Sequence, residues 1–390
     1  MRKRKHRAKT ALTPPTTKQH SASQIVGIAS ISLGWILWGG LHWYGDAFPI
    51  LHEQRLIIGL GVGVFVLMLG CVLSVVRNAD HLADLLPEPY GTLVLTLAAT
   101  IIEVSLMLQM MFNGKNNPGL LRDTVFAILM ITMNGMVGAA ITSGGWRHRE
   151  QGFNLRGALS FVQLIAPLSM MLLIMPNYTV SSKGPTLDLR QEIYLGTLSV
   201  VVYLLFLMIQ TGRHRSYFDH ASTNPHSTEL HSPNIQDRNW GTLLKLGAGM
   251  VISLIPVVLL SEYLGEAVNY GIIELKAPTA LGGLIIASLG LTPEGLGAIR
   301  AALANRMQRA VNICLGTTLS TIGLTVPIIL IAASSQGVEL TLGLDGTNST
   351  LLMATLLITL ITFVSGGANI LQGIIHLMLF IGYFIFILFP

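Results

Sequence analysis

Residues 91–112 read GTLVLTLAATIIEVSLMLQMMF, an apolar run with one charged side chain, Glu103. About 20 apolar residues in a helix cross a bilayer core about 30 Å thick, so this run predicts a transmembrane helix. A rise of about 1.5 Å per residue places Glu103 about 18 Å beyond Gly91, near the middle of the bilayer. A carboxylate at that depth costs several kcal/mol and normally faces a cavity or a partner. The run therefore predicts both a membrane protein and a functional site.

The composition of the whole chain agrees with this interpretation. Of its 390 residues, 51% are apolar and 11% are charged, whereas a soluble protein carries about 25% charged residues. An ordinary soluble enzyme is therefore excluded, and we expect an all-α polytopic membrane protein with about eleven transmembrane helices. The apolar runs lie near 25–45, 56–76, 91–112, 123–143, 157–176, 191–211, 243–261, 278–300, 309–333, 349–365 and 368–389.

The distribution of basic residues predicts how the chain is oriented in the membrane. With the N-terminus in the cytoplasm, 18 of the 24 Lys and Arg residues fall on the cytoplasmic side and 6 fall outside. Cytoplasmic loops of membrane proteins carry such an excess of Lys and Arg. We therefore expect a bacterial inner-membrane protein with a cytoplasmic N-terminus and a periplasmic C-terminus. The loop 262–277, which carries three glutamates, is expected outside the cell.

Two segments of the chain resemble each other. Gly91 precedes Glu103 by 12 residues, and Gly282 precedes Glu294 by 12 residues. Each copy contains five of the expected spans, and an odd number of spans forces the second copy to insert upside down. Inverted repeats of this kind are typical of transporters. The chain is thus divided into a basic cytoplasmic tail (1–24), a leading helix with an external loop (25–55), a first five-helix repeat (56–211), a cytoplasmic linker (212–242) and an inverted repeat (243–390).

Glu103 and Glu294 are the only acids well inside any of the expected spans. The repeat places them at corresponding depths from opposite sides, so their carboxylates are expected to face each other. Carboxylate oxygens suit Ca²⁺, and also Na⁺ and K⁺. Protons and cations would compete for the same oxygens, which is the minimum requirement for a cation/proton antiporter. The alternative is that each glutamate only hydrogen-bonds to a neighbouring helix.

The residues around the two acids indicate further oxygen ligands. Pro293 precedes Glu294 and Gly295 follows it, which predicts a break in the helix and free carbonyl oxygens for a cation. Neutral side-chain oxygens one turn before each glutamate or in the following helix are candidate supporting ligands: Thr100, Thr292, Asn134 and Asn312.

The stretch VVRNAD at 75–80, the stretch EPYG at 88–91 and the stretch LTPEGLGA at 291–298 resemble the Ca²⁺/H⁺ exchanger branch of the cation/Ca²⁺ antiporter superfamily. The similarity is greatest to its bacterial Cha-type members, which exchange Ca²⁺, Na⁺ or K⁺ for H⁺. It implies that the two repeat glutamates bind the cation and exchange it for protons. Many members carry Gly-Asn-Ala-x-Glu, whereas this chain lacks both asparagines, so the preferred cation stays open.

The same resemblance implies an amphipathic cytoplasmic segment near the entrance, whose acids attract cations. The candidate entrance acids are Asp80, Asp84 and Glu88. An ordinary solvated loop between two spans is the alternative.

Four histidines in one loop and one histidine in the last span are further candidate functional residues. The loop 212–242 contains His214, His220, His226 and His231, and its Ser, Asn and Pro content favours a flexible linker over a pH-sensing or metal-binding role. His376 lies within the last expected span. It is either part of a proton path or, as is more common for one intramembrane histidine, bonded locally.

These features together predict a secondary antiporter and not an enzyme. Cytoplasmic cation would bind between Glu103 and Glu294, and alternating access would expose it to the outside in exchange for protons. A cation channel with the same carboxylates is the main alternative, and a membrane-embedded enzyme is a weaker one. We expect no cofactor and no nucleic-acid partner; the partners are inorganic cations, protons and the lipid bilayer.

Overall fold

The computed structural model describes residues 17–44, 54–86, 90–113, 117–213, 215–218 and 240–389. Within these residues, ten helical segments are long and apolar enough to span a membrane, and Thr96–Phe112 forms a shorter apolar helix. Each of the eleven expected spans corresponds to a helical segment, so the prediction of an all-α polytopic fold is confirmed. The N-terminal tail up to residue 16 and the four histidines of the linker lie outside the described residues.

The helices follow the predicted order of one leading helix and two sets of five. The leading helix is α1 (Thr17–Tyr44). The first set consists of α2 (Gln54–Leu85), α3 (Tyr90–Asn113), α4 (Leu120–Leu129) joined through the π-helical turn η3 (Met130–Met136) to α5 (Val137–His148), α6 (Leu155–Leu173) and α7 (Leu189–Met208). The second set consists of α8 (Trp240–Glu274), α9 (Ala280–Leu303), α10 (Met307–Ser320) joined through the π-helical turn η8 (Thr321–Thr325) to α11 (Val326–Ser335), α12 (Gly346–Val364) and α13 (Ile370–Leu388).

Short elements complete the chain. They are the strands β1 (Glu150–Gly152) and β2 (Gly367–Asn369), and the turns η4 (Met175–Asn177), η5 (Ile209–Arg213) and η6 (Arg215–Tyr217).

Matching elements of the two sets have matching lengths. Helices α3 and α9 have 24 residues each, and the rods α4–η3–α5 and α10–η8–α11 have 29 residues each. Helices α6 and α12 have 19 residues each. The N-terminal caps match as well, because α7 and α13 both begin with a capping box, at Asp188 and at Asn369. The two sets are therefore structural repeats.

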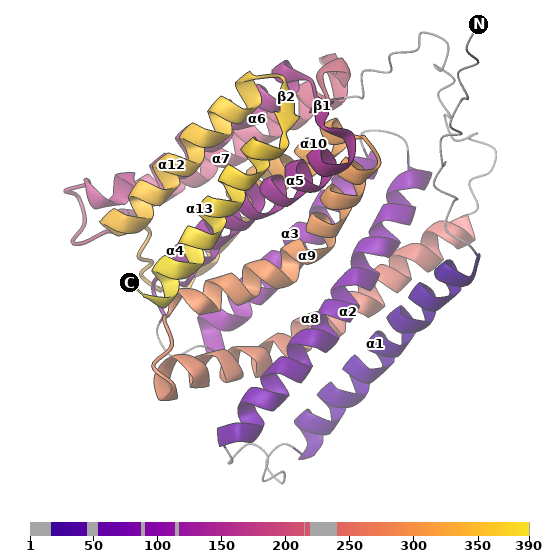
Figure 1. The fold of residues 1–390 in the computed structure, drawn as a ribbon. Helices are drawn as coiled ribbons and strands as arrows, with labels where there is room; N and C mark the ends of the chain where they lie inside the picture. Colours follow the sequence, from indigo (N-terminus) through magenta and orange to yellow (C-terminus); the bar gives the residue numbers. More distant parts are fainter. Residues whose placement is uncertain are drawn as a thin grey trace, which may run out of the picture.

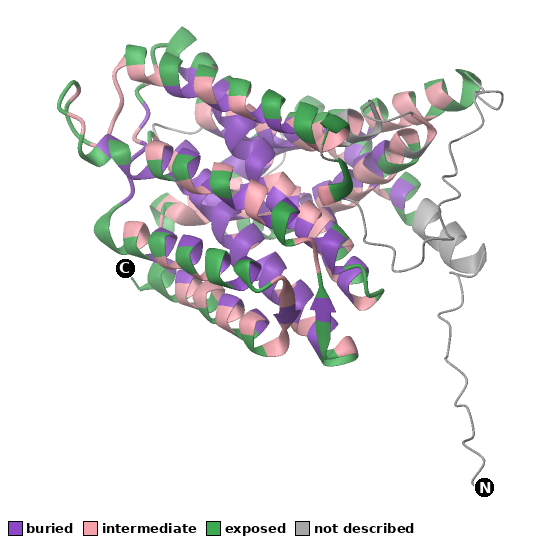
Figure 2. Cartoon of the chain, turned by 90° about the horizontal axis from the view of Figure 1, so that it is seen from above, coloured by how far each residue is buried: buried purple, intermediate pink, exposed green. Residues whose placement is uncertain are grey.

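The helices form two groups that lie side by side (Figure 1). Helices α1, α2 and α8 make one group, and the cysteine Sγ of Cys71 on α2 lies 3.4 Å from the carbonyl oxygen of Ser30 on α1. The other group is built around the rods α4–η3–α5 and α10–η8–α11, which are the most buried segments. Buried residues accordingly gather in the middle of this group (Figure 2). The two π-helical turns thus lie inside the protein, away from lipid.

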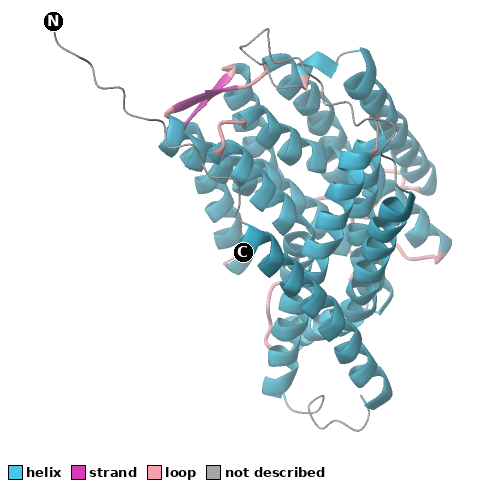
Figure 3. Ribbon diagram, turned by 90° about the vertical axis from the view of Figure 1, so that its right-hand side faces the viewer, coloured by secondary structure: helices cyan, strands magenta, loops and turns pink. Residues whose placement is uncertain are grey.

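The connecting segments pair reciprocally between the two repeats. Strand β1, which leads into α6, pairs antiparallel with β2, which follows α12, and the pair lies at one end of the molecule (Figure 3). The segment leading into α12 in turn bonds to the segment that follows α6, since the N–H of Leu344 donates to the carbonyl of Leu173 (2.8 Å) and that of Leu342 to Pro185 (2.9 Å). Such an exchange is what two inverted repeats related by an approximate twofold axis require.

One expected loop is wrong. The acidic segment 262–277 is not a loop, because α8 continues to Glu274 and carries Glu262 and Glu266 on its last turns. Glutamate is a good helix former, and after Pro256, which lies inside α8, the next proline is Pro278 beyond its end. With 35 residues, α8 is also longer than the hydrocarbon core requires. Its last turns, which carry these acids, therefore extend beyond the apolar part of the helix.

Candidate functional site

Glu103 lies on α3 and is 7% exposed. Its carboxylate accepts hydrogen bonds from two threonines of the π-helical turn η8. The Oγ1 of Thr321 lies 3.0 Å from each carboxylate oxygen, and the Oγ1 of Thr325 lies 2.7 Å from Oε2. Buried carboxylates need such partners, and here two hydroxyl groups supply them.

Glu294 lies on α9 and is only half-buried. It accepts one hydrogen bond, from the Oγ1 of Thr317 on α10 at 2.8 Å. Its side chain lines a cavity of about 310 Å³. The polar side chains that line this cavity with Glu294 are Asp80, Thr96, Tyr203, Gln210, Arg309, Asn312, Thr317 and Ser320.

The two glutamates lie close together where α3 passes α9. Gly290, one turn before Glu294, faces Glu103, and a methyl group on Gly290 would lie 3.7 Å from Cγ of Glu103. The charge of Glu103 acts on Glu294. Neither carboxylate forms an ion pair with a basic residue of the described part of the chain. The structure therefore brings together the two acids that the repeat predicted.

The hydroxyl groups around the acids are not the expected ones. Thr292 donates to the carbonyl of Ser288 in its own helix (2.6 Å), and the buried hydroxyl of Thr100 has no hydrogen-bond partner. Threonine in a helix commonly bonds to the carbonyl four residues earlier, so a position one turn before the glutamate does not direct its oxygen at the carboxylate.

The two expected asparagines also bond elsewhere. Asn312 lines the cavity, but its amide donates to the carbonyl of Phe218 (2.7 Å). Asn134 donates to Thr355 (2.8 Å) and accepts from His376 (3.2 Å). None of the four expected supporting groups hydrogen-bonds to Glu103 or Glu294 in this structure.

Sequence reasoning missed the three threonines that do contact the acids. Thr317, Thr321 and Thr325 are spaced by four residues, and residues four apart lie on one face of a helix. This spacing was the available signal. The spacing is hard to recognise in the sequence because Thr318 interrupts it and because the carboxylates that these threonines contact lie on other helices.

The predicted helix break is wrong. Helix α9 runs without interruption from Ala280 to Leu303, with Pro293 inside it and Gly295 in the following turn. Proline removes one backbone donor, but a transmembrane helix packed among others tolerates this loss. The irregular backbone lies instead in the next helical rod of each repeat, at η3 and η8. Such π-helical turns occur frequently at functional sites.

The cavity opens toward the end of the molecule where α2 ends. Asp80, an expected entrance acid, is exposed, lines the cavity and acts electrostatically on Glu294. It lies on α2, so the segment is helical up to Leu85 and not a loop there. The side chain of Asp84 and all of Glu88 lie outside the described residues. Glu103 is not among the residues that line the cavity.

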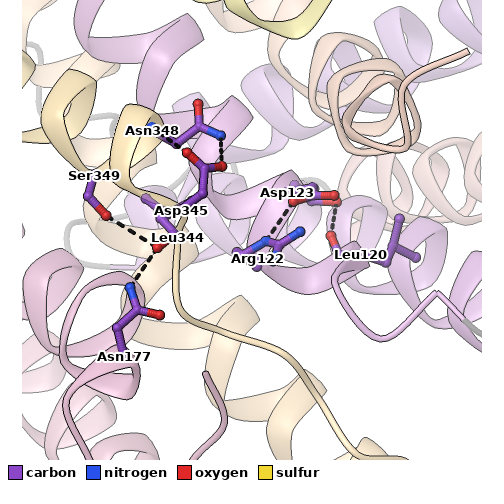
Figure 4. A network of polar contacts seen from close by, with 9 residues as sticks. Leu120, Arg122, Asp123, Asn177, Leu344, Asp345, Asn348 and Ser349 are labelled. Atoms are coloured by element: carbon purple, nitrogen blue, oxygen red, sulfur yellow. Dashed lines mark hydrogen bonds and ion pairs between the residues drawn. The ribbon is translucent and has the colours of Figure 1, made fainter. Parts of the chain in front are cut away.

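Polar contacts gather at the opposite end of the molecule, where α4 and α12 begin (Figure 4). The Nε of Arg122 lies 2.8 Å from Oδ1 of the buried Asp123. Asp345 caps α12 by accepting from the backbone and the side chain of Asn348, at 2.9 and 2.6 Å. The charges of Asp123 and Asp345 interact, so the first turns of α4 and α12 meet at this end.

The family model described as sodium/calcium exchanger protein matches residues 56–212 and 245–389. The putative ionic transporter y4hA of Sinorhizobium fredii is 36% identical over 317 residues, which cover 80% of this chain and 84% of the relative. The sodium-potassium/proton antiporter ChaA of Escherichia coli is 33% identical over 353 residues, which cover 89% and 91%.

The solved structure of native YfkE, a Ca²⁺/H⁺ antiporter protein, is similar with a TM-score of 0.72. Its sequence is 16% identical, and the match covers 94% of this chain and 100% of that one. A likeness at this low identity concerns the fold alone.

Proposed function

Because the chain belongs to the sodium/calcium exchanger protein family, we propose that it is an antiporter in which Glu103 and Glu294 alternately bind a cation and protons. The family consists of transporters and not of enzymes. The chain is a multi-pass membrane protein, and the comparisons give no support to the channel alternative.

The observation that carries this proposal is the environment of the acid pair. Two carboxylates lie together at the meeting point of two repeats, and hydroxyl groups supply their hydrogen bonds. A hydroxyl group is both a donor and an acceptor. The threonines that donate to an empty carboxylate can therefore rotate and offer a lone pair to a cation, whereas a lysine or arginine at this place would compete with the cation.

The proposed transport cycle depends on which end of the molecule gives ions access to the two acids. In this structure the cavity reaches Glu294 from the Asp80 end, while at the opposite end backbone hydrogen bonds from Thr341 to Pro118 and from Leu342 to Pro185 link the two repeats. A cation entering the cavity would displace protons from the acid pair. Rearrangement of the repeats would then open the opposite end, where protons displace the cation and reset the site.

The direction of transport depends on the orientation in the membrane. We place the N-terminus in the cytoplasm and the C-terminus in the periplasm of a bacterial inner membrane, on the excess of Lys and Arg that this assigns to the cytoplasmic side. The Asp80 end of the cavity is then cytoplasmic, and the protein exports cation. The oxygen donors suit hard cations, so Ca²⁺, Na⁺ and K⁺ are the candidates, as they are for the relatives.

Antiport is tested in everted membrane vesicles with an imposed pH gradient and a proton-sensitive dye. Ca²⁺, Na⁺ and K⁺ are added in turn to wild type, Glu103→Gln, Glu294→Gln and the control Glu192→Gln, which changes an acid at the start of α7. We expect one or more cations to collapse the gradient in wild type and control with the membrane potential clamped, and neither site variant to respond. A response only without the clamp would indicate a channel, and full activity in both site variants would refute the site.

A further inference from the structure

A buried polar network lies on the far side of η3 from the glutamates. Asn134 in η3, Thr355 and Thr362 on α12, and His376 on α13 are each at most 1% exposed. The Nδ1 of His376 lies 3.2 Å from Oδ1 of Asn134, and its Nε2 lies 3.0 Å from Oγ1 of Thr362. Nδ2 of Asn134 donates to Oγ1 of Thr355 at 2.8 Å.

The chemistry of these groups fixes their roles. An amide oxygen only accepts, so Nδ1 of His376 donates to Asn134, and Nε2 of the neutral ring accepts from the hydroxyl group of Thr362. Every ring nitrogen and the amide of Asn134 are therefore satisfied within the network. Burial makes the loss of any one partner costly to the other.

The same π-helical turn contacts the surroundings of Glu294. The hydroxyl group of Thr132 lies 2.6 Å from that of Thr318, the residue next to the threonine that bonds to Glu294. Met136 packs against Gly295, because a methyl group on Gly295 would lie 3.3 Å from Cγ of Met136. One end of η3 thus reaches α10 and the other reaches α9, and the anchor at Asn134 lies between them.

The other repeat has apolar residues at the corresponding positions. His376 is the seventh residue after the cap Asn369, and the seventh residue after the cap Asp188 is Leu195. Thr355 is the tenth residue after the cap of α12, and the tenth after the cap of α6 is Leu164. The threonines of η8, the π-helical turn of the second repeat, bond to Glu103 instead. The histidine network therefore joins α12 and α13 of the second repeat to η3 of the first, the π-helical turn that lies beside Glu294.

We propose that His376 is a positioning residue that holds η3 in place through Asn134. Because η3 packs against α9 and α10, it in turn keeps the side chain of Glu294 directed into the cavity. This inference rests on the proposed function of Glu294. Loss of the ring would free η3 to shift and would leave Glu294 and Thr317 less well placed for a cation. Partners that orient a ligand contribute about 10- to 100-fold to metal affinity, so His376→Leu should raise the apparent KM for the cation about tenfold, with a smaller change in maximal rate.

The test compares KM and maximal rate of antiport in vesicles for wild type, His376→Leu, His376→Gln and Asn134→Leu. Glutamine can donate to Asn134 and accept from Thr362, so His376→Gln should restore most of the affinity. The double variant His376→Leu/Asn134→Leu should have the KM of a single variant, because both changes break the same link. His148→Leu is the control, since it removes a histidine whose hydrogen-bond partner among the described residues is the carbonyl of Leu303, away from this network.

Several results would overturn the proposal: an unchanged KM in His376→Leu, no rescue by glutamine, or additive effects in the double variant. If His376→Leu does not accumulate in the membrane, Thr362→Val and Asn134→Leu provide the same comparison. Wild type and Glu294→Gln are measured in parallel. Antiport that Glu294→Gln abolishes and His376→Leu leaves unchanged would refute the role of His376 alone, whereas full activity in Glu294→Gln would refute the proposed function.

Discussion

Glu103 and Glu294 occupy corresponding positions in two inverted repeats, yet their surroundings differ. Glu103 is buried and accepts hydrogen bonds from two threonines of η8. Glu294 faces a cavity and accepts from one threonine of α10. Two identical surroundings would leave the acid pair equally accessible, or equally closed, from both ends. The difference between them is what gives this structure one open end.

The difference arises in the π-helical turns and in what lies behind each of them. Behind η8, carbon atoms of Tyr203 pack closely against Gly323, and the turn directs its hydroxyl groups toward Glu103. Behind η3, α12 and α13 present threonines and His376, and Asn134 bonds to them. Hydrogen bonds to α12 and α13 therefore anchor η3, whereas η8 is held by packing.

The largest predicted effect concerns the two acids themselves. Glu103→Gln and Glu294→Gln should each lower the rate of cation-driven proton movement about 100-fold or more, because each removes a charged ligand of one shared site. The rates are measured in vesicles containing equal amounts of protein. A variant that keeps wild-type exchange would show that the two acids do not form one site.

The next effect distinguishes the surroundings of Glu103 from those of Glu294. Removing a hydrogen bond to a charged group costs about 1.5–3 kcal/mol, so Thr325→Val should change the apparent KM about tenfold or more. Thr317→Val should act less strongly, since Glu294 is open to water. Serine variants keep the hydroxyl group and serve as matched controls. Equal effects at the two positions would contradict the difference between the two surroundings.

A smaller effect concerns the packing behind η8. A methyl group on Gly323 would lie 2.6 Å from Cβ of Tyr203, so Gly323→Ala must displace the turn that carries Thr321 and Thr325. Overpacking of this kind costs about 1–3 kcal/mol and should lower the Tm in detergent. Gly290→Ala is the matched control, because its methyl group has room at 3.7 Å from the nearest side-chain atom. A lower Tm in the control alone would refute this account of the packing.

The smallest predicted effect lies at the cavity entrance. Asp80 is exposed and acts on Glu294 through its charge, so Asp80→Asn should raise the apparent KM about two- to threefold, as expected for a screened charge. The effect should shrink with added salt. Glu339→Gln, at another exposed acid, should leave KM unchanged. A loss of activity that salt does not alter would instead assign Asp80 a direct role in binding.

Much of the fold was readable from the sequence because its signals are local or periodic. The apolar runs indicated the spans, and the equal spacing of Gly91–Glu103 and Gly282–Glu294 indicated the repeat. The two acids were identified because each lies well inside an apolar run. The partners of these acids were not readable in the same way. Thr321 and Thr325 are separated from Glu103 by more than two hundred residues, and only the packing of the two repeats brings them together.

Local rules failed where tertiary packing decides the outcome. Pro293 and Gly295 favour a break, but the helices packed around α9 keep it continuous. The end of the apolar run near residue 261 suggested a loop over 262–277, whereas α8 continues to Glu274 beyond the apolar core. In the same way Asn134 has the right chemistry for a cation ligand, and only the structure places His376 where it bonds to that oxygen.

We propose that Glu103 and Glu294 form one site that holds either a cation or protons. The most direct measurement is proton release from the purified protein in weakly buffered detergent when Ca²⁺, Na⁺ or K⁺ is added. The account predicts that wild type releases protons as it binds cation, and that Glu103→Gln and Glu294→Gln each lose cation binding and proton release together. Cation binding with undiminished proton release in either variant would contradict the claim.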